Sequence, residues 1–191
     1  MMHQRRFTGR IAPFAALIAV ALLAAPAARA QDEPRIVQVK GCLSREAVRP
    51  GETFRAALVL QIRPGYHIND NAPLDEFMIP TTLTIDGGPD FEIVEIAFPK
   101  GRRARFSYSE AELVVYEGEV VLGALIKAKS GLAAGPRVLK GALGYQACND
   151  ASCLPPKEEP FEITVPVTAA GGVADLHPEI FGKIRFNALR K

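Results

Sequence analysis

Short apolar stretches separated by turn residues run along most of the chain. Seven of them are rich in Val, Ile, Leu, Thr and Phe, a composition that is typical of β-strands. They cover residues 35–40, 53–62, 81–85, 91–98, 113–129 (with a break at Glu117-Gly118), 137–147 and 161–167. Pro-Gly and Gly-Pro pairs mark turns between them. The pattern predicts an all-β fold, with about seven strands arranged as an immunoglobulin-like sandwich.

The segment after the last apolar stretch has a different pattern. Asp175 stands before Pro178, and Ile180, Phe181 and Ile184 follow at helical spacing. An acidic residue shortly before a proline is a common start of a helix. We therefore expect one domain over residues 31–170 and a tail over residues 171–191, with a short helix that Asp175 caps and that packs on the domain.

The first thirty residues have the order of regions found in a secretory signal. Three arginines are followed by an apolar run over residues 11–25 and then by Ala28-Arg29-Ala30, which suits a signal peptidase. The alternative, an uncleaved membrane anchor, is less favoured because the run is short and interrupted by Ala and Pro. We expect residues 1–30 to be a signal peptide and the mature chain to act outside the cytoplasm.

The charge balance changes once this segment is set aside. Four of the 23 Lys and Arg residues lie in residues 1–30 and none of the 21 Asp and Glu residues do, so the mature chain is slightly acidic. That charge gives no reason to expect nucleic acid or an anionic membrane as a partner. No second apolar run is long enough to span a bilayer, so we expect no membrane insertion after signal cleavage.

Two cysteines lie close together in YQACNDASCLPP, residues 145–156. On a helix, Cys148 and Cys153 would be separated by roughly 7.5 Å of rise and would point about 140° apart, so their sulfurs could not bond. On either side of a four-residue hairpin loop they would lie opposite each other at disulfide distance. Asn149 and Asp150 suit such a loop. We expect a disulfide at the tip of a β-hairpin.

The residues alone leave three roles open for this pair. A structural disulfide closing so small a ring adds about 2 kcal/mol, less than one that closes a long loop. Zinc would need a second cysteine pair, but copper(I) could be held by the two thiolates together with Met78 or His67. A redox couple needs one accessible sulfur and a second cysteine that resolves a mixed disulfide.

Two further residues have chemistry to consider. Cys42 is left over once Cys148 and Cys153 are paired. We expect its side chain to be a small buried hydrophobe at a strand end; the alternative is a disulfide between two molecules. His67 could act as an acid or base towards a thiol near neutral pH, or be a structural histidine at a strand end. We leave His67 out of the catalytic set.

Five motifs resemble the N-terminal periplasmic domain of the DsbD thiol:disulfide interchange protein family. They are GYHIND (65–70), IPTTLTI (79–85), FPKGRR (98–103), VYEGEVVL (115–122) and GYQACNDASCLPP (144–156). The resemblance runs from about Ile36 to Val167, and the cysteine motif is its most specific part. It implies an immunoglobulin-like fold, a periplasmic location and thiol-disulfide exchange without a bound cofactor.

The resemblance also implies a catalytic couple and its partners. Cys153 would form mixed disulfides with other proteins, and Cys148 would resolve them. The electron donor would be a thioredoxin-like protein, and the acceptor a periplasmic disulfide isomerase or a cytochrome c maturation thioredoxin. The chain stops at Lys191 without the membrane module of the full-length family members, so we expect a separate membrane protein to feed the donor.

Family members shield the disulfide with an aromatic residue on a cap loop. In the segment KGRRARFSYSE, residues 100–110, the resemblance makes Phe106 the cap and Tyr108 the alternative. The best-known members have five residues between the cysteines where this chain has four. They also carry acidic residues near the cap, where this chain has Arg102, Arg103 and Arg105. Guanidinium groups that reached a sulfur would lower the cysteine pKa.

Four residues around the pair are candidates for docking partners or tuning the thiols. Asn149 and Asp150 lie between the cysteines, and Tyr145 and Gln146 precede the first of them. Tyr145 and Gln146 could instead hold the hairpin on the sheet.

Overall fold

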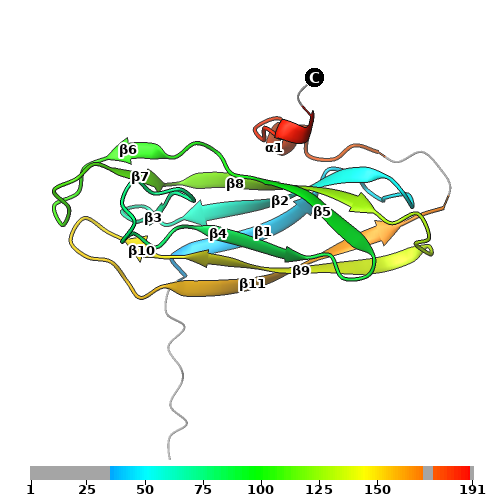
Figure 1. Ribbon diagram of the computed structural model, residues 1–191, viewed down its shortest axis with the longest axis horizontal. Coiled ribbons are helices and arrows are strands. Elements are labelled where there is room, and N and C mark those ends of the chain that lie inside the picture. The colour runs from blue at the N-terminus through cyan, green and yellow to red at the C-terminus, as the bar shows by residue number, and fades with distance from the viewer. Residues whose placement is uncertain (1–34, 170–173, 190–191) are drawn as a thin grey trace, which may run out of the picture. The chain divides into compact units, whose positions relative to one another are not determined.

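Three antiparallel sheets make up the fold in the computed structural model, which describes residues 35–169 and 174–189 (Figure 1). Two of the sheets pack face to face, and a third, built from short strands, lies at one end. The predicted signal peptide, residues 1–30, lies outside the described residues. Within the described part of the chain, no helix has the length and apolar content needed to cross a membrane.

The first sheet has four strands in the order β1-β2-β8-β5, with every neighbouring pair antiparallel. The strands are β1 (Val37–Leu43), β2 (Thr53–Ile62), β5 (Phe91–Ala97) and β8 (Glu119–Ala128). Alternate residues of β2, among them Phe54, Leu58 and Leu60, point into the main core. This is the period of two that a strand requires for one buried face.

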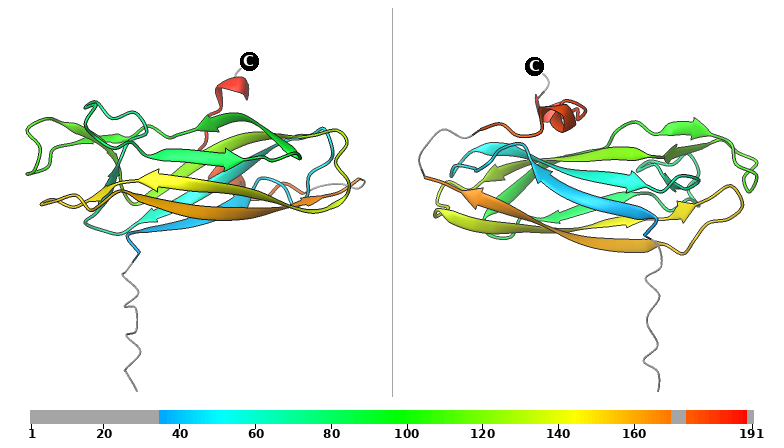
Figure 2. Two further views of the ribbon diagram at one scale, coloured as in Figure 1. Left: turned by 60° about the horizontal axis from the view of Figure 1, so that its bottom comes forward. Right: turned by 180° about the vertical axis from the view of Figure 1, so that it is seen from behind.

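The second sheet has the order β11-β9-β4 and closes the core from the other side (Figure 2). Its strands are β4 (Thr82–Asp86), β9 (Gly135–Tyr145) and β11 (Lys157–Val167). Leu139 and Leu143 of β9 and Val165 of β11 are fully buried against the first sheet. Burying each such side chain contributes about 1.5–3 kcal/mol. The predicted all-β, immunoglobulin-like sandwich is confirmed.

The third sheet has the order β10-β3-β7-β6 and forms where strands leave the sandwich. Its members are β3 (His67–Asn69), β6 (Arg102–Ala104), β7 (Leu113–Tyr116) and β10 (Ala147–Cys148). The predicted break at Glu117-Gly118 is confirmed, since it separates β7 from β8, and Gly118 supplies the positive φ of 64° that this turn needs. The predicted strand over residues 137–147 is interrupted at Gln146, which separates β9 from β10. The strands β3 and β6 were not predicted, because three residues are too few to show alternation.

The tail contains the helix α1 (Pro178–Phe181) and the 3-10 turn η1 (Asn187–Leu189). The prediction that Asp175 caps the helix is wrong. His177, with a left-handed φ of 53°, holds the cap position without a side-chain bond. Asp175 instead forms a β-bridge and a 3.7 Å ion pair with Arg45. The alternative partner was available because the chain around residue 45 lies beside the tail.

The tail covers the outer face of the first sheet, so it packs on its own domain as predicted. Phe181, Ile184 and Phe186 are buried in a second cluster against β2, β5 and β8. A Cβ at Gly123 of β8 would meet the Ile184 Cγ2 atom at 2.5 Å. Strand β8 is therefore buried on both faces, which explains its nearly continuous apolar sequence.

Candidate functional site

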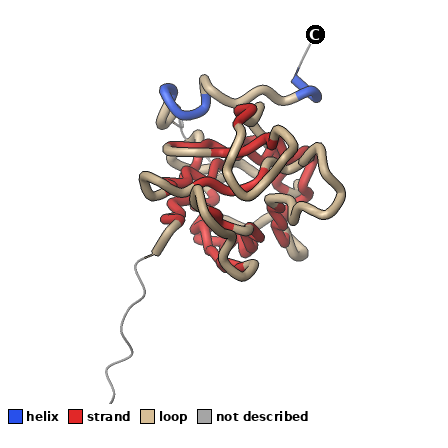
Figure 3. Tube along the Cα trace, turned by 90° about the vertical axis from the view of Figure 1, so that its left-hand side faces the viewer, coloured by secondary structure: helices blue, strands red, loops and turns tan. Residues whose placement is uncertain are grey.

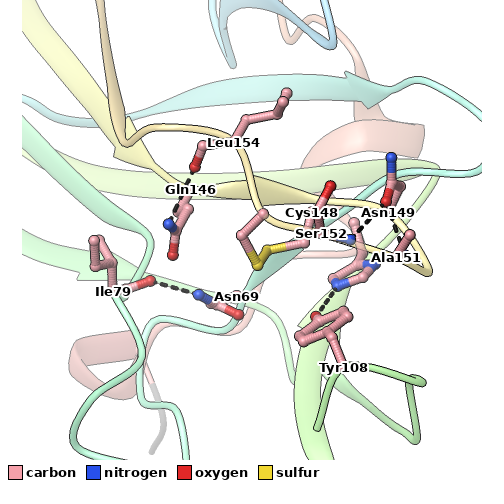
Figure 4. Close-up of a disulfide and its surroundings, with 11 residues drawn as sticks. Asn69, Ile79, Tyr108, Gln146, Cys148, Asn149, Ala151, Ser152 and Leu154 are labelled. Atoms are coloured by element: carbon pink, nitrogen blue, oxygen red, sulfur yellow. Dashed lines mark hydrogen bonds between the residues drawn. A yellow bond between two sulfur atoms is a disulfide. The ribbon is translucent and has the colours of Figure 1, made fainter.

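Cys148 and Cys153 form a disulfide at the tip of a hairpin, as the spacing predicted (Figure 4). The two residues are cross-strand partners with a Cα separation of 3.9 Å. Hydrogen bonds flank the pair, from Asn149 N to Ser152 O (2.9 Å) and from Leu154 N to Ala147 O (2.8 Å). This pattern marks a non-hydrogen-bonded pair, the position at which opposite side chains come closest.

The side chain of Asn149 organises the four-residue loop between the cysteines. Its Oδ1 atom accepts hydrogen bonds from the backbone N–H groups of Ala151 and Ser152, each at 2.9 Å. At the base of the hairpin, the Gln146 amide donates to the Leu154 carbonyl at 3.1 Å (Figure 4). These contacts fix the loop that carries the disulfide.

The two cysteines differ in exposure. Cys148 ends strand β10 and is 0% exposed, whereas Cys153 belongs to the exposed residues after the loop. The difference arises because β10 pairs with β3 inside the third sheet, while Cys153 lies on the outer arm of the hairpin. A protein approaching from solvent therefore meets Cys153 first.

His67 lies directly across from Cys148 on strand β3 and is only 2% exposed. Its Nε2 atom is hydrogen-bonded to the Tyr108 hydroxyl at 2.7 Å, and the Phe106 ring stacks on it with a centroid distance of 3.8 Å. Burial lowers the pKa of His67, against the opposing effect of the Glu117 and Asp150 carboxylates. The imidazole is therefore neutral at pH 7.

The segment over residues 105–112, called the cap loop below, lies against the hairpin loop. Phe106 and Tyr108 are half-buried in it, with ring centroids 5.6 Å apart. Between them, the Ser107 hydroxyl donates a hydrogen bond to the carbonyl of Asp150. Burial, with a contribution from the Asp150 carboxylate, raises the pKa of Tyr108. The structure thus brings both predicted cap residues to the disulfide end of the sandwich, where loops gather (Figure 3).

The arginines that precede the cap loop are paired with carboxylates. Arg102 contacts Glu117 at 2.5 Å, and Arg103 contacts Glu112 at 2.8 Å. These pairs are solvent-exposed, so each is worth at most about 1 kcal/mol. They direct the two guanidinium groups towards these carboxylates.

The four candidate docking or tuning residues have different surroundings. Tyr145 is 4% exposed within the main core, where burial raises its pKa. Gln146 and Asn149 are half-buried and bonded within the hairpin. Asp150 is exposed, and its carbonyl receives the cap loop. Asp150 and the Cys153 arm are exposed to solvent.

Sequence reasoning missed an exposed apolar loop that follows β3. In it, Leu74, Phe77 and Ile79 are exposed, Phe77 to 85%. The Asn69 amide holds the loop by donating to the Ile79 carbonyl at 2.9 Å (Figure 4). The sequence has no signal for this, because the loop lacks periodicity and its exposure depends on where β3 and β4 lie.

Cys42 is a free thiol, 9% exposed, in the cluster beneath the tail. Burial raises its thiol pKa, which keeps it protonated and unreactive. The prediction of a small buried hydrophobe near a strand end is confirmed. In the described part of the chain, no three His, Cys, Asp or Glu side chains gather closely enough to hold a metal ion.

Solved structures similar to this chain include the following three. The N-terminal domain of DsbD from Neisseria meningitidis, in the reduced form, is 20% identical with a TM-score of 0.41, covering 72% of this chain and 88% of that one. The same domain in complex with the PilB N-terminal domain is 18% identical with a TM-score of 0.39, covering 72% of this chain and 88% of that one. The N-terminal periplasmic domain of ScsB from Proteus mirabilis is 16% identical with a TM-score of 0.44, covering 68% of this chain and 46% of that one.

No curated protein matches the chain. A family model does: the model described as "Thiol:disulfide interchange protein DsbD, N-terminal" matches residues 33–165. The match covers well over half of the sequence, including the cysteine hairpin, the cap loop and all three sheets. The chain therefore belongs to the family of N-terminal domains of the thiol:disulfide interchange protein DsbD.

Proposed function

We propose that this chain is a periplasmic thiol-disulfide oxidoreductase that relays electrons between proteins at Cys148 and Cys153. The observation that carries the proposal is the difference in exposure within one disulfide, with Cys148 buried and Cys153 exposed at a hairpin tip. Thiol-disulfide interchange is the activity of the family to which the chain belongs. A disulfide that served stability alone would gain nothing from having one of its two cysteines exposed.

The disulfide is first reduced by a dithiol donor. A donor thiolate attacks the Cys153 Sγ atom, the Sγ–Sγ bond breaks, and Cys148 leaves as a thiolate that takes up a proton. The second donor thiolate then attacks the donor sulfur of the mixed disulfide and releases Cys153 as a thiolate. The donor departs as a disulfide, and two electrons have passed to this chain.

The reduced pair then passes these electrons to an oxidised acceptor. The Cys153 thiolate attacks the acceptor disulfide and forms a mixed disulfide, with one acceptor sulfur leaving as a thiolate that is protonated. Cys148, once deprotonated, attacks the Cys153 Sγ atom and re-forms the internal disulfide. The acceptor leaves as a dithiol. Every bond change involves only sulfur and protons, so no bound cofactor is needed.

The donor we propose is a thioredoxin-like protein, supplied in turn by a membrane protein. The acceptor is a periplasmic disulfide isomerase or a cytochrome c maturation thioredoxin. Both classes present a reactive cysteine at their surface, which the exposed Cys153 arm of the hairpin can reach. The predicted signal peptide over residues 1–30 supports the location.

The cap loop controls access to the pair in this proposal. Phe106 is the main shield, with Tyr108 beside it, and the Ser107 hydrogen bond to the Asp150 carbonyl keeps the loop against the hairpin. A single such bond is worth about 1 kcal/mol net. A docking partner can therefore displace the loop at small cost.

The experiment that tests the relay is a redox titration of the Cys148–Cys153 couple, with Cys42→Ser as the background. A relay between a thioredoxin-like donor and a disulfide isomerase is expected to titrate at about −270 to −180 mV. A potential below about −300 mV contradicts the relay and supports a binding module with a structural disulfide. The reduced protein is also tested for copper(I) binding. Retention of copper(I) at a low free-copper concentration would support the copper-handling alternative.

A further inference from the structure

We propose that His67 is a positioning residue that holds the cap loop closed over the Cys148–Cys153 disulfide. The inference rests on the proposed function, because it assigns the device that controls access to the same pair. His67 was a candidate for an acid or base, or for a purely structural histidine. Its contacts point to a third role: the buried imidazole contacts both aromatic residues of the cap loop and holds them in place.

Both cap residues meet this one imidazole. The Phe106 ring stacks on it with an interplanar angle of 17°, and the Tyr108 hydroxyl is hydrogen-bonded to its Nε2 atom at 2.7 Å. The Tyr108 ring is nearly parallel to the imidazole as well, at 6°. Beyond these two rings, the Ser107 hydroxyl makes the loop's contact with the hairpin. Removing the imidazole would leave the two rings without their common support.

The same residue is next to the disulfide. His67 on β3 is the cross-strand partner of Cys148 on β10, and side chains of directly opposed residues lie on one face of a sheet with Cβ atoms about 4.5–5.5 Å apart. Cys148 is 0% exposed and His67 is 2% exposed. His67 thus contacts both cap residues and is also the cross-strand partner of the buried cysteine.

The cap loop is sensitive to acid through His67. The charged and titratable groups around the imidazole are the Glu117 and Asp150 carboxylates, the Arg102 guanidinium and the Tyr108 hydroxyl. Burial, to which the stacked Phe106 ring contributes, lowers the His67 pKa. An open cap loop would return the pKa towards its ordinary value. Protons therefore bind the open state more tightly, and lowering the pH below about 6.5 favours opening.

The test measures how fast dithiothreitol reduces the disulfide in matched variants. His67→Phe keeps a stacking ring and loses the nitrogen, and Tyr108→Phe removes the hydroxyl from the other side of the same hydrogen bond. Tyr66→Phe, which removes a hydroxyl from a neighbouring residue packed on the main core, is the matched control. We expect reduction about fivefold faster in His67→Phe and in Tyr108→Phe, the effect of one lost hydrogen bond, and no change in the control.

Two further readouts separate positioning from general loosening. The double variant should be no faster than either single one, since the same bond is lost. The rate of the parent protein divided by that of His67→Phe should approach one as the pH falls through the His67 pKa, because acid opens only the parent's cap loop. If His67→Phe does not fold, Tyr108→Phe tests the same bond from the half-buried cap loop.

Equal rates in the parent, His67→Phe and Tyr108→Phe would overturn the role of His67, as would a rate ratio independent of pH. Neither result bears on whether the couple relays electrons, since the reduction potential is measured separately. Conversely, a potential too low for a relay, together with faster reduction in the two variants, would reject the relay and leave the closing role of His67 intact.

Discussion

At the scale of residues, the site depends on two identical side chains placed in unlike surroundings. Cys148 lies on β10, the edge strand of the third sheet, which pairs with β3, and Cys153 follows the loop on the exposed arm. The loop between them is set by Asn149, whose side chain binds two backbone N–H groups. These contacts leave Cys148 buried and Cys153 exposed before any partner arrives.

The difference in exposure predicts which single cysteine captures a partner. With Cys42→Ser as background, Cys148→Ser is mixed with a thioredoxin-like protein whose single remaining active-site cysteine carries thionitrobenzoate as a mixed disulfide. The exposed Cys153 should attack that disulfide, release thionitrobenzoate and accumulate as a mixed disulfide with the partner, because no second cysteine remains to break it. Cys153→Ser should accumulate far less, because the remaining Cys148 is buried. Intact-mass measurement of the unreduced mixture distinguishes the two, and equal trapping by both variants would contradict the assignment.

At the scale of elements, the tail is a structural part of the sandwich. It lies across β2 and β8, and its buried aromatic residues give the first sheet a second covered face. The Phe181 ring also lies under the Arg55 guanidinium, at 5.2 Å from the ring centroid. The backbone of η1 is held as well, with the Glu95 carboxylate accepting from the N–H groups of Asn187 and Ala188 at 2.8 Å each.

This packing predicts that the tail contributes to the stability of the whole domain. Phe181→Ala should lower the free energy of unfolding by about 3 kcal/mol, since it removes a buried aromatic ring and leaves a cavity. Leu189→Ala is the control at an exposed position of the same tail, 56% exposed, and should change stability by at most about 0.5 kcal/mol. Urea unfolding measures the free energy of unfolding of both variants. An equally small loss of stability in Phe181→Ala and Leu189→Ala would mean that the tail does not support the sheet.

At the scale of the whole molecule, most of the core comes from the first and second sheets, and the third sheet, which carries the disulfide, adds Ile68, Tyr116 and Ala147 to it. The main core lies between the two larger sheets, and the disulfide closes only a short loop at the edge of the third sheet. A relay protein must stay folded in both redox states, and this separation of core from disulfide permits it. The buried free Cys42 also lies in a different cluster from the reactive pair.

The separation predicts a folded reduced state. Because the disulfide joins residues only five apart, reduction should cost about 2 kcal/mol of stability or less. Urea unfolding of the oxidised and reduced forms, each with Cys42→Ser, should give two cooperative transitions with similar slopes and a modest difference in midpoint. A reduced form that unfolds without added denaturant would contradict the prediction and would make the disulfide a structural necessity.

The sequence by itself determined the features that depend on neighbours in the chain. Alternating apolar residues predicted β2 at its observed bounds, and Glu117-Gly118 predicted the turn between β7 and β8. The spacing of the cysteines predicted the hairpin disulfide, since a helix would keep the two sulfurs apart and a four-residue hairpin loop places them opposite each other. In each case the conformation is set by local sterics and side-chain periodicity, which one stretch of sequence carries in full.

Only the tertiary structure decided which distant segments meet. It placed His67 opposite Cys148, the cap loop against the Asp150 carbonyl, and Asp175 beside Arg45 instead of at a helix start. It also covered β8 on its second face with the tail. Such contacts join residues far apart in the chain, and they form because the whole core fixes the strands, so no local pattern could specify them.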